Sequence, residues 1–146
     1  MYPRLDHIVI VVDDLKSAVA FFTTLGLKPE GKPTPVEGPW VDRVNNIDNV
    51  RVDIVMMVTP DGHGKVELTK FHSPKPLTPT PTPAPPNTFG YRSIMFEVDD
   101  IDDTVARLRA RGNDLIGEIA EYEDIYRLCY VHGPEGVIVA LAQRIG

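Results

Sequence analysis

Polar side chains recur at alternate positions in the segments of the chain that are rich in branched apolar residues. His7 begins one such segment, Glu67 lies inside a second, and Ser93 begins a third. Because successive side chains of a strand point to opposite faces, each of these residues shares a face with its i+2 neighbours. One face of each strand is then apolar, and the other mixes imidazole, carboxylate and hydroxyl groups. Such a mixed face is typical of a binding cavity.

Large apolar side chains are expected to line the same face. Methionine suits an irregular ligand because its side chain is flexible and polarisable. The single tryptophan, Trp40, follows a predicted loop over Gly31–Pro39 and begins a predicted short strand, Trp40–Val44. Its indole could stack on a flat ligand or instead plug the core. Strand alternation assigns four further residues to the cavity face: Asp53, Met57, Phe71 and Met95.

The other chemically active side chains have simpler interpretations. Glu67 could act as a general base, because a carboxylate partly withdrawn from water is a stronger proton acceptor. His63, His72 and His132 fall in or beside predicted turns and are interpreted as rim or solvent residues. The single cysteine, Cys129, excludes an internal disulfide and any multi-cysteine zinc site, and its apolar neighbours predict strand packing.

A repeat in the sequence positions these residues. His7–Gly26 and Ser93–Gly112 match without gaps at an offset of 86 residues, and seven of the 20 aligned positions are identical. Each copy reads as a short strand, an Asp-Asp pair, apolar residues at helical spacing and a closing glycine. We expect Asp13 and Asp99 to be the helix N-caps, since a carboxylate can accept from the free N–H groups of the first turn.

Strands are expected after each helix. They are Val50–Val58 and Val66–Phe71 in the first half, and Asp124–Val131 and Val137–Ala142 in the second. Each half is therefore predicted to be a β-α-β-β-β module of an α+β protein. The expected organisation is a first module over residues 1–72, a proline-rich linker over 73–88 and a second module over 89–146.

The linker contains the densest proline run of the chain. Seven of the 14 prolines fall in Pro74–Pro86. Proline lacks the N–H that a sheet interior needs and disfavours helix in the preceding residue. The run therefore predicts an extended, stiff spacer, with a ligand for a proline-binding module as the alternative.

Composition limits the classes of function. The chain has 146 residues, of which 42% are hydrophobic and 25% charged, as expected for one globular domain of two small modules. Its net charge of −6 argues against a nucleic-acid partner. Its apolar stretches are too short to cross a bilayer and it opens on no signal-peptide pattern, so we expect a cytoplasmic protein with no membrane partner.

The whole pattern resembles the vicinal oxygen chelate superfamily, which includes glyoxalase I, extradiol dioxygenases, fosfomycin-resistance enzymes and bleomycin-resistance proteins. The resemblance rests on four segments: Asp6–Asp14, Lys65–Leu68, Ser93–Asp100 and Gly133–Leu141. It implies half-open barrel sheets, two of which close into a cup-shaped cavity either within a chain or across a dimer. It also implies a homodimer.

The resemblance further implies where a metal would bind. Metal-dependent members carry one ligand on the first strand of each module and another on its last strand. The matching positions are His7 and Glu67 in the first module, and Ser93 and Ala140 in the second. Serine is a poor ligand and alanine is none, so His7 and Glu67 form an incomplete, weak site, whereas catalytic zinc usually has three protein ligands. We therefore expect no cofactor, with a weakly bound divalent metal as the alternative.

The last hairpin decides which of its side chains face the cup. If the turn is tight, Cys129 lies opposite Ala140, and Arg127 faces the cup, where it could bind a ligand carboxylate or phenolate. A register shift of one residue would instead turn Tyr126 and Tyr130 toward the cup.

These observations favour a small-molecule-binding protein that sequesters a partly aromatic natural product or antibiotic without catalysis, as bleomycin-resistance relatives do. One alternative is a metal-dependent lyase, isomerase or dioxygenase of the glyoxalase or extradiol type. A second is a metal-free lyase or isomerase with Glu67 or His7 as base. The predicted ligand-binding residues are His7, Trp40, Asp53, Met57, Glu67, Phe71, Ser93, Met95, Arg127 and Ala140.

Overall fold

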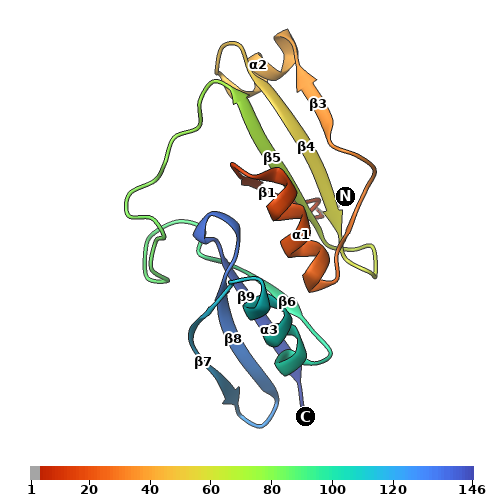
Figure 1. Cartoon of the computed structure of the whole chain (residues 1–146), viewed down its shortest axis with the longest axis vertical. Helices are drawn as coiled ribbons and strands as arrows, with labels where there is room; N and C mark the ends of the chain where they lie inside the picture. The colour runs from red at the N-terminus through yellow and green to blue at the C-terminus, as the bar shows by residue number, and fades with distance from the viewer. Residues whose placement is uncertain (1–3) are drawn as a thin grey trace. The chain divides into compact units, whose positions relative to one another are not determined.

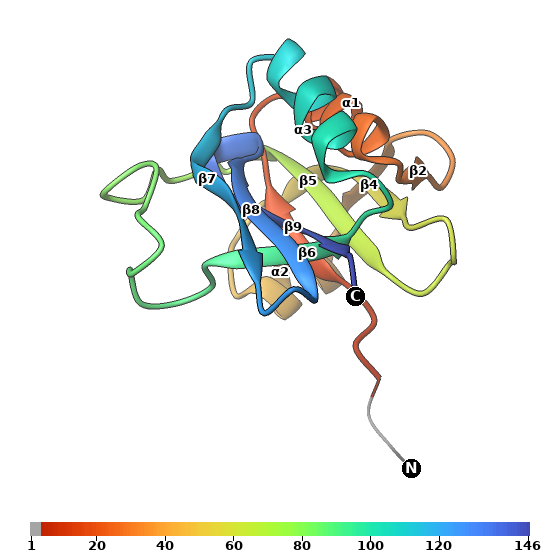
Figure 2. The same ribbon diagram turned by 90° about the horizontal axis from the view of Figure 1, so that it is seen from below.

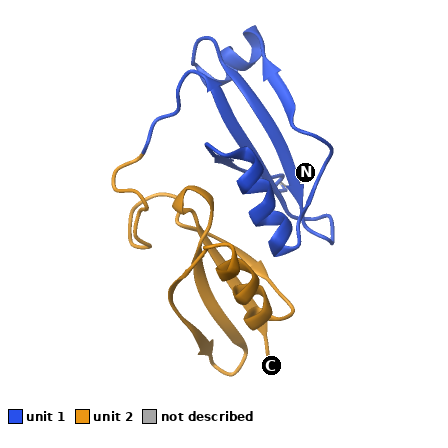
Figure 3. Cartoon of the chain, in the orientation of Figure 1, with its two compact units in different colours: residues 1–78 blue, residues 79–146 orange. Residues whose placement is uncertain are grey.

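The computed structural model describes residues 4–146, and the chain divides into two compact units, Met1–Thr78 and Pro79–Gly146 (Figure 3). Each unit contains one open β-sheet with a helix packed on one of its faces. The predicted α+β class with half-open sheets is therefore confirmed. In both units we call the sheet surface under this helix the helix face, and the opposite surface the open face.

Unit 1 has a sheet of five strands in the order β1-β5-β4-β2, with β3 also paired to β4. β1 and β5 are parallel, and the other pairs are antiparallel. Helix α1 lies across β5 and β4 (Figure 1). The elements are β1 (Ile8–Val11), α1 (Leu15–Leu25), β2 (Lys28–Pro29), β3 (Thr34–Glu37), α2 (Pro39–Asn45), β4 (Arg51–Val58) and β5 (Lys65–Ser73).

Unit 2 is the simpler β-α-β-β-β arrangement, with sheet order β6-β9-β8-β7. Helix α3 packs on β8 and β9, as Figure 2 shows. β6 and β9 are parallel, as β1 and β5 are in unit 1, so the sequence repeat is a structural repeat. The elements are β6 (Ser93–Glu97), α3 (Ile101–Ala110), β7 (Leu115–Tyr122), β8 (Tyr126–His132), a 3₁₀ turn (Pro134–Gly136) and β9 (Ile138–Arg144).

Both long helices begin one residue later than expected. The N-caps are Asp14 and Asp100, whose side chains accept from the backbone N–H of Ser17 and Asp103. The first aspartate of each Asp-Asp pair is therefore not the cap. Apolar residues on one side of each helix then fill the core: Ala18, Phe21 and Phe22 in α1, and Ile101, Val105 and Leu108 in α3.

The segment after α1 differs from its prediction. Thr34–Glu37 is a strand, not a loop, and the expected strand Trp40–Val44 is part of helix α2. Pro39 begins that helix, a position where the missing proline N–H costs nothing. β2 and β3 both pair with β4, so together they form one edge strand that is interrupted near Gly31, where the backbone has φ 73°.

The proline-rich segment is exposed from Pro74 to Pro83. Lys75–Pro79 has no turn or bend, as an extended spacer requires, but bends follow at Thr80–Pro83. There the Thr82 hydroxyl donates to the carbonyl of Pro79. None of the helices described in residues 4–146 has the length and apolar character needed to span a membrane.

Candidate functional site

The open face of unit 1 brings His7 and Glu67 together. In the parallel pair of β1 and β5, Val9 lies beside Glu67, and His7 is two residues before Val9 on the same face. His7 Nε2 is 3.4 Å from Glu67 Oε1. The imidazole is 29% exposed and the carboxylate 17%, so a small molecule can reach both groups.

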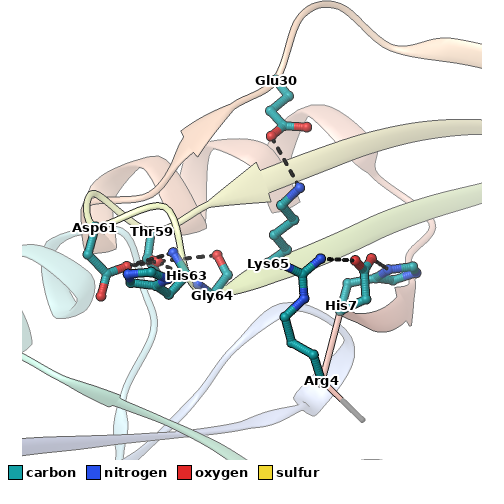
Figure 4. Close-up of polar contacts among 9 residues, drawn as sticks. Arg4, His7, Glu30, Thr59, Asp61, His63, Gly64 and Lys65 are labelled. Atoms are coloured by element: carbon teal, nitrogen blue, oxygen red, sulfur yellow. Dashed lines mark hydrogen bonds and ion pairs between the residues drawn. The ribbon is translucent and has the colours of Figure 1, made fainter. Parts of the chain in front are cut away.

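Two residues that the sequence analysis did not assign hold this pair in place. Asp6 Oδ2 lies 2.7 Å from His7 Nδ1, and the hydroxyl of Thr69 donates to Glu67 Oε2 over 2.7 Å. Arg4 reaches the same Asp6 carboxylate, with Nη2 3.6 Å from Oδ1 (Figure 4). The hydrogen bond with His7 is the main cause that lowers the pKa of Asp6. The i+2 spacing from Glu67 places Thr69 on the same face, but it does not identify the hydrogen bond between them.

The two contacts of His7 determine what the pair can bind. A carboxylate only accepts hydrogen bonds, so the bond to Asp6 places a proton on Nδ1 of the ring. Nε2 of a neutral imidazole is then an acceptor, and it faces Glu67 Oε1, which is also an acceptor. Two acceptors attract each other only through a shared proton or cation, or through a donor group of a ligand. With a neutral imidazole the arrangement suits a ligand with N–H or O–H donors, whereas a protonated ring would itself donate to Glu67.

Apolar side chains surround this polar pair on the open face. Across the antiparallel ladder of β4 and β5, Met56 lies opposite Glu67, Ile54 opposite Thr69 and Val52 opposite Phe71. Phe71 packs against a small apolar cluster of Val41, Val50 and Val52, which links α2 to this face. Phe71 thus shares the face of Glu67, as expected. The open face of unit 1 combines one polar anchor with a broad apolar surface.

Asp53 and Met57 do not lie on that face, so this part of the prediction is wrong. Met57 pairs with Val66 and is fully buried, on the helix face. Asp53 has the same strand parity, and its carboxylate is 2.9 Å from Nε2 of His72. The misassignment arose because the all-apolar set of β4 side chains was expected to face the helix, whereas it faces away from it.

Trp40 lies in the first turn of α2 and is 56% exposed. It borders a shallow hollow together with Pro35, Val36 and Glu37. The indole is therefore not buried in the core. It belongs to α2, which contacts β3, and β3 lies on the side of β4 away from the strands that carry His7 and Glu67.

In unit 2 the open face is mostly apolar. Met95 pairs with Ala140, and Tyr130 lies opposite Ala140 on its other side. Ala140 therefore has the strand position that Glu67 has in unit 1. Met95 is 55% exposed and Tyr130 37% exposed, so both are open to contact. Ser93 begins β6 on the same face as Met95.

The predicted register of the last hairpin is wrong by one residue. Cys129 lies opposite Leu141, because the backbone N–H of Gly133 bonds the carbonyl of Val137 and lengthens the turn. Arg127 therefore faces α3, where its guanidinium makes two hydrogen bonds to Asp102, at 2.6 and 3.0 Å. This contact lowers the pKa of Asp102. The predicted alternative, with the tyrosines on the open face, is the register found.

Cys129 is buried on the helix face, which agrees with strand packing. Burial raises the pKa of its thiol, so the group stays protonated at neutral pH.

The donors present do not fit a catalytic metal centre. Within residues 4–146, no three His, Cys, Asp or Glu side chains gather where they could hold an ion. His7 and Glu67 offer two ligands, and the corresponding positions of unit 2 hold Ser93 and Ala140, as expected from the sequence. His63 lies in an exposed turn and His72 contacts Asp53, so neither completes the pair.

The comparisons with known proteins agree on the fold. The model of the Glyoxalase/Bleomycin resistance protein/Dioxygenase superfamily matches residues 4–141. A glyoxalase family protein from Bacillus cereus is 44% identical, with a TM-score of 0.94 over 100% of this chain and 97% of that one. A fosfomycin resistance protein from Listeria monocytogenes, solved with Mn(II) and sulfate, is 14% identical, with a TM-score of 0.64 over 99% and 92% of the chains.

A domain from Frankia sp. EAN1pec, described as a glyoxylase/bleomycin resistance protein/dioxygenase, is 13% identical. It has a TM-score of 0.67 over 99% of each chain, and at this identity the likeness shows the fold alone. Among curated proteins, no match was found.

Proposed function

Because the chain belongs to the glyoxalase/bleomycin resistance protein/dioxygenase superfamily, we propose that it binds a partly aromatic natural product or antibiotic and sequesters it without catalysis. One observation supports this most directly. His7 and Glu67 place two atoms that can accept hydrogen bonds 3.4 Å apart on a largely apolar face, and no third metal ligand joins them within residues 4–146.

In this proposal, the acceptor pair binds an N–H or O–H donor of the ligand. Phe71 and the apolar side chains of β4 contact its aromatic part, and the exposed Ser93 and Met95 form the corresponding surface of the second unit. Ala140 lies between Met95 and Tyr130 in the sheet and is fully buried, so we do not expect it to contact the ligand. We further propose that the protein acts in the cytoplasm as a homodimer, the state that the family resemblance implies.

A thermal-shift screen of aromatic antibiotics and natural products, with bleomycin as one probe, tests the proposal. The screen is run in EDTA, and each compound that binds is recovered and weighed by mass spectrometry. We expect at least one compound to raise the melting temperature and to be recovered unchanged. Binding that requires added metal, or recovery of a chemically altered compound, would contradict the proposal.

A metal-dependent lyase, isomerase or dioxygenase is the second candidate, and one contact favours it. The Asp6 carboxylate on Nδ1 of His7 fixes the ring with Nε2 directed at Glu67, as second-shell carboxylates do for metal-binding histidines. The fosfomycin resistance protein of the same fold was solved with Mn(II). Activity that is lost in chelator and restored by one divalent metal would establish this candidate over the first.

A further inference from the structure

An exposed apolar surface lies on unit 1, away from the His7–Glu67 pair. Trp40 and Val44 are four residues apart on α2 and therefore lie on one side of the helix, 56% and 78% exposed. Ile47, just after the helix, is 38% exposed. Beside them is the hollow lined by Pro35, Val36, Glu37 and Trp40. An exposed patch of this kind, with a tryptophan at its centre, is typical of an interaction site.

The chain itself carries a segment with matching chemistry. Pro76-Leu77-Thr78-Pro79 has the spacing of a proline-rich ligand, and Leu77 in it is 95% exposed. Proline-rich segments dock on aromatic-lined grooves, because proline rings stack on indoles and the stiff chain loses little entropy. Lys75 is the only charged residue of Ser73–Pro86, and Glu37 is the charged residue of the hollow, so their charges are complementary.

The positions of the two features suit a reciprocal contact between two copies. Arg51 of β4 pairs with Glu37 on one side and with Ser73 on the other. Glu37 of the hollow and Ser73, which precedes the proline-rich segment, are therefore about two strand spacings apart, or roughly 10 Å, at one end of the sheet. A two-fold axis beside that end can place each copy's segment on the hollow of the other, as an isologous interface requires.

We propose that the proline-rich segment Lys75–Pro79 of one copy docks on the Trp40 hollow of a second copy, with Lys75 paired to Glu37. The occupant is thus a second copy of this chain. This inference does not rest on the proposed ligand, since none of these residues belongs to the His7–Glu67 pair.

Charge reversal tests the proposal on the full-length chain. The molecular mass is measured by light scattering over a range of concentrations. Acrylamide quenching of Trp40, the only tryptophan, reports on the hollow. We expect a dimer with a protected indole at high concentration. Glu37→Lys and Lys75→Glu each place like charges at both contacts of the dimer, so each should weaken dimerisation about tenfold.

Mixing the two variants identifies the occupant. In a mixed dimer both contacts again join opposite charges, so an equimolar mixture should regain the mass and the indole protection of the wild type. Lys16→Glu on α1 and Glu118→Lys on β7, both exposed, are the matched controls and should behave as wild type.

Three results would overturn the proposal. The first is a monomer with a fully quenchable indole at every concentration. The second is a dimer that neither reversal weakens. The third is rescue only when both reversals are on one chain and not on mixing, which would mean that the segment docks on its own chain.

Discussion

At the scale of single residues, the hydroxyl of Thr69 orients the carboxylate of Glu67. The Thr69 hydroxyl donates to one oxygen of the carboxylate, which leaves the other oxygen toward His7. Thr69 is 5% exposed, so water cannot easily replace its hydrogen bond. The site's affinity for a donor group therefore depends on a residue that we do not expect to contact the ligand.

Thr69→Val tests this role. Valine has nearly the same shape but no hydroxyl, so the fold should persist while the carboxylate loses its orienting donor. We expect the affinity for a bound ligand to fall about tenfold, measured by calorimetry, since a lost hydrogen bond to a carboxylate costs roughly 1–3 kcal/mol. Thr24→Val on α1, whose hydroxyl donates to the carbonyl of Ala20, is the control. An unchanged affinity for Thr69→Val would contradict the assigned role.

We expect Arg127 to bind Asp102 of α3 and not to contact the ligand. Its guanidinium lowers the pKa of Asp102 in the folded protein. The contact therefore stabilises the fold above the ordinary pKa of an aspartate and loses this effect as the pH falls through the lowered value. In Arg127→Gln, we expect NMR titration to show the Asp102 pKa returning upward, with ligand affinity unchanged. Loss of ligand binding in this variant would contradict this assignment and would mean that Arg127 belongs to the ligand-binding site.

The contact between His7 and Glu67 could be predicted from the sequence, because the resemblance matched them to paired positions on two adjacent strands. Thr69 lay on the assigned face, but nothing in the sequence marked its hydroxyl as the partner of Glu67. Asp53 and Met57 were assigned to the wrong face, because the all-apolar face of β4 was expected to pack against the helix and alternation alone does not say which face the helix covers.

At the scale of elements, α1 and α3 begin at the second aspartate of each Asp-Asp pair. Either aspartate has a carboxylate that could cap the helix N-terminus, and only the backbone geometry decides which one does. Asp14 has the extended conformation of a cap and bonds the N–H of Ser17. Asp13 instead lies near Lys70, whose Nζ is 3.6 Å from its carboxylate.

Asp14→Ala should therefore destabilise the protein by about 1 kcal/mol, the usual cost of losing an N-cap. Asp13→Ala is the matched neighbour and should cost less, because its ion pair is exposed. Urea unfolding of both variants measures the difference. Equal losses, or a larger loss for Asp13→Ala, would contradict the assignment of the cap.

Helix α2 shows why some elements escape sequence reasoning. The run Trp40–Val44 is too short to show a clear period, and Pro39 and the contact of Val41 with the β4 cluster favour a helix. Val41 packs against Val50 and Val52, which are distant enough in sequence that no local pattern reveals the contact. The hairpin register failed for a related reason, since the length of the turn after His132 depends on one backbone hydrogen bond.

At the scale of the whole molecule, the two units are copies of one architecture with different open faces. The repeat at an offset of 86 residues was enough to predict both sheets, because strand, cap, helix and closing glycine recur in order. Unit 1 has the polar pair His7 and Glu67, and the corresponding positions of unit 2 hold Ser93 and Ala140. This asymmetry is the physical basis for proposing binding without metal chemistry.

Elemental analysis of the full-length protein, purified without added metal or chelator, tests that claim most directly. With two protein ligands brought together within residues 4–146, we expect far less than one transition-metal ion per chain, because a site of this kind holds metal weakly. His7→Ala should leave the metal content of the preparation unchanged. About one tightly held ion per chain in the wild type, lost in His7→Ala, would contradict the account and favour the metal-dependent enzyme.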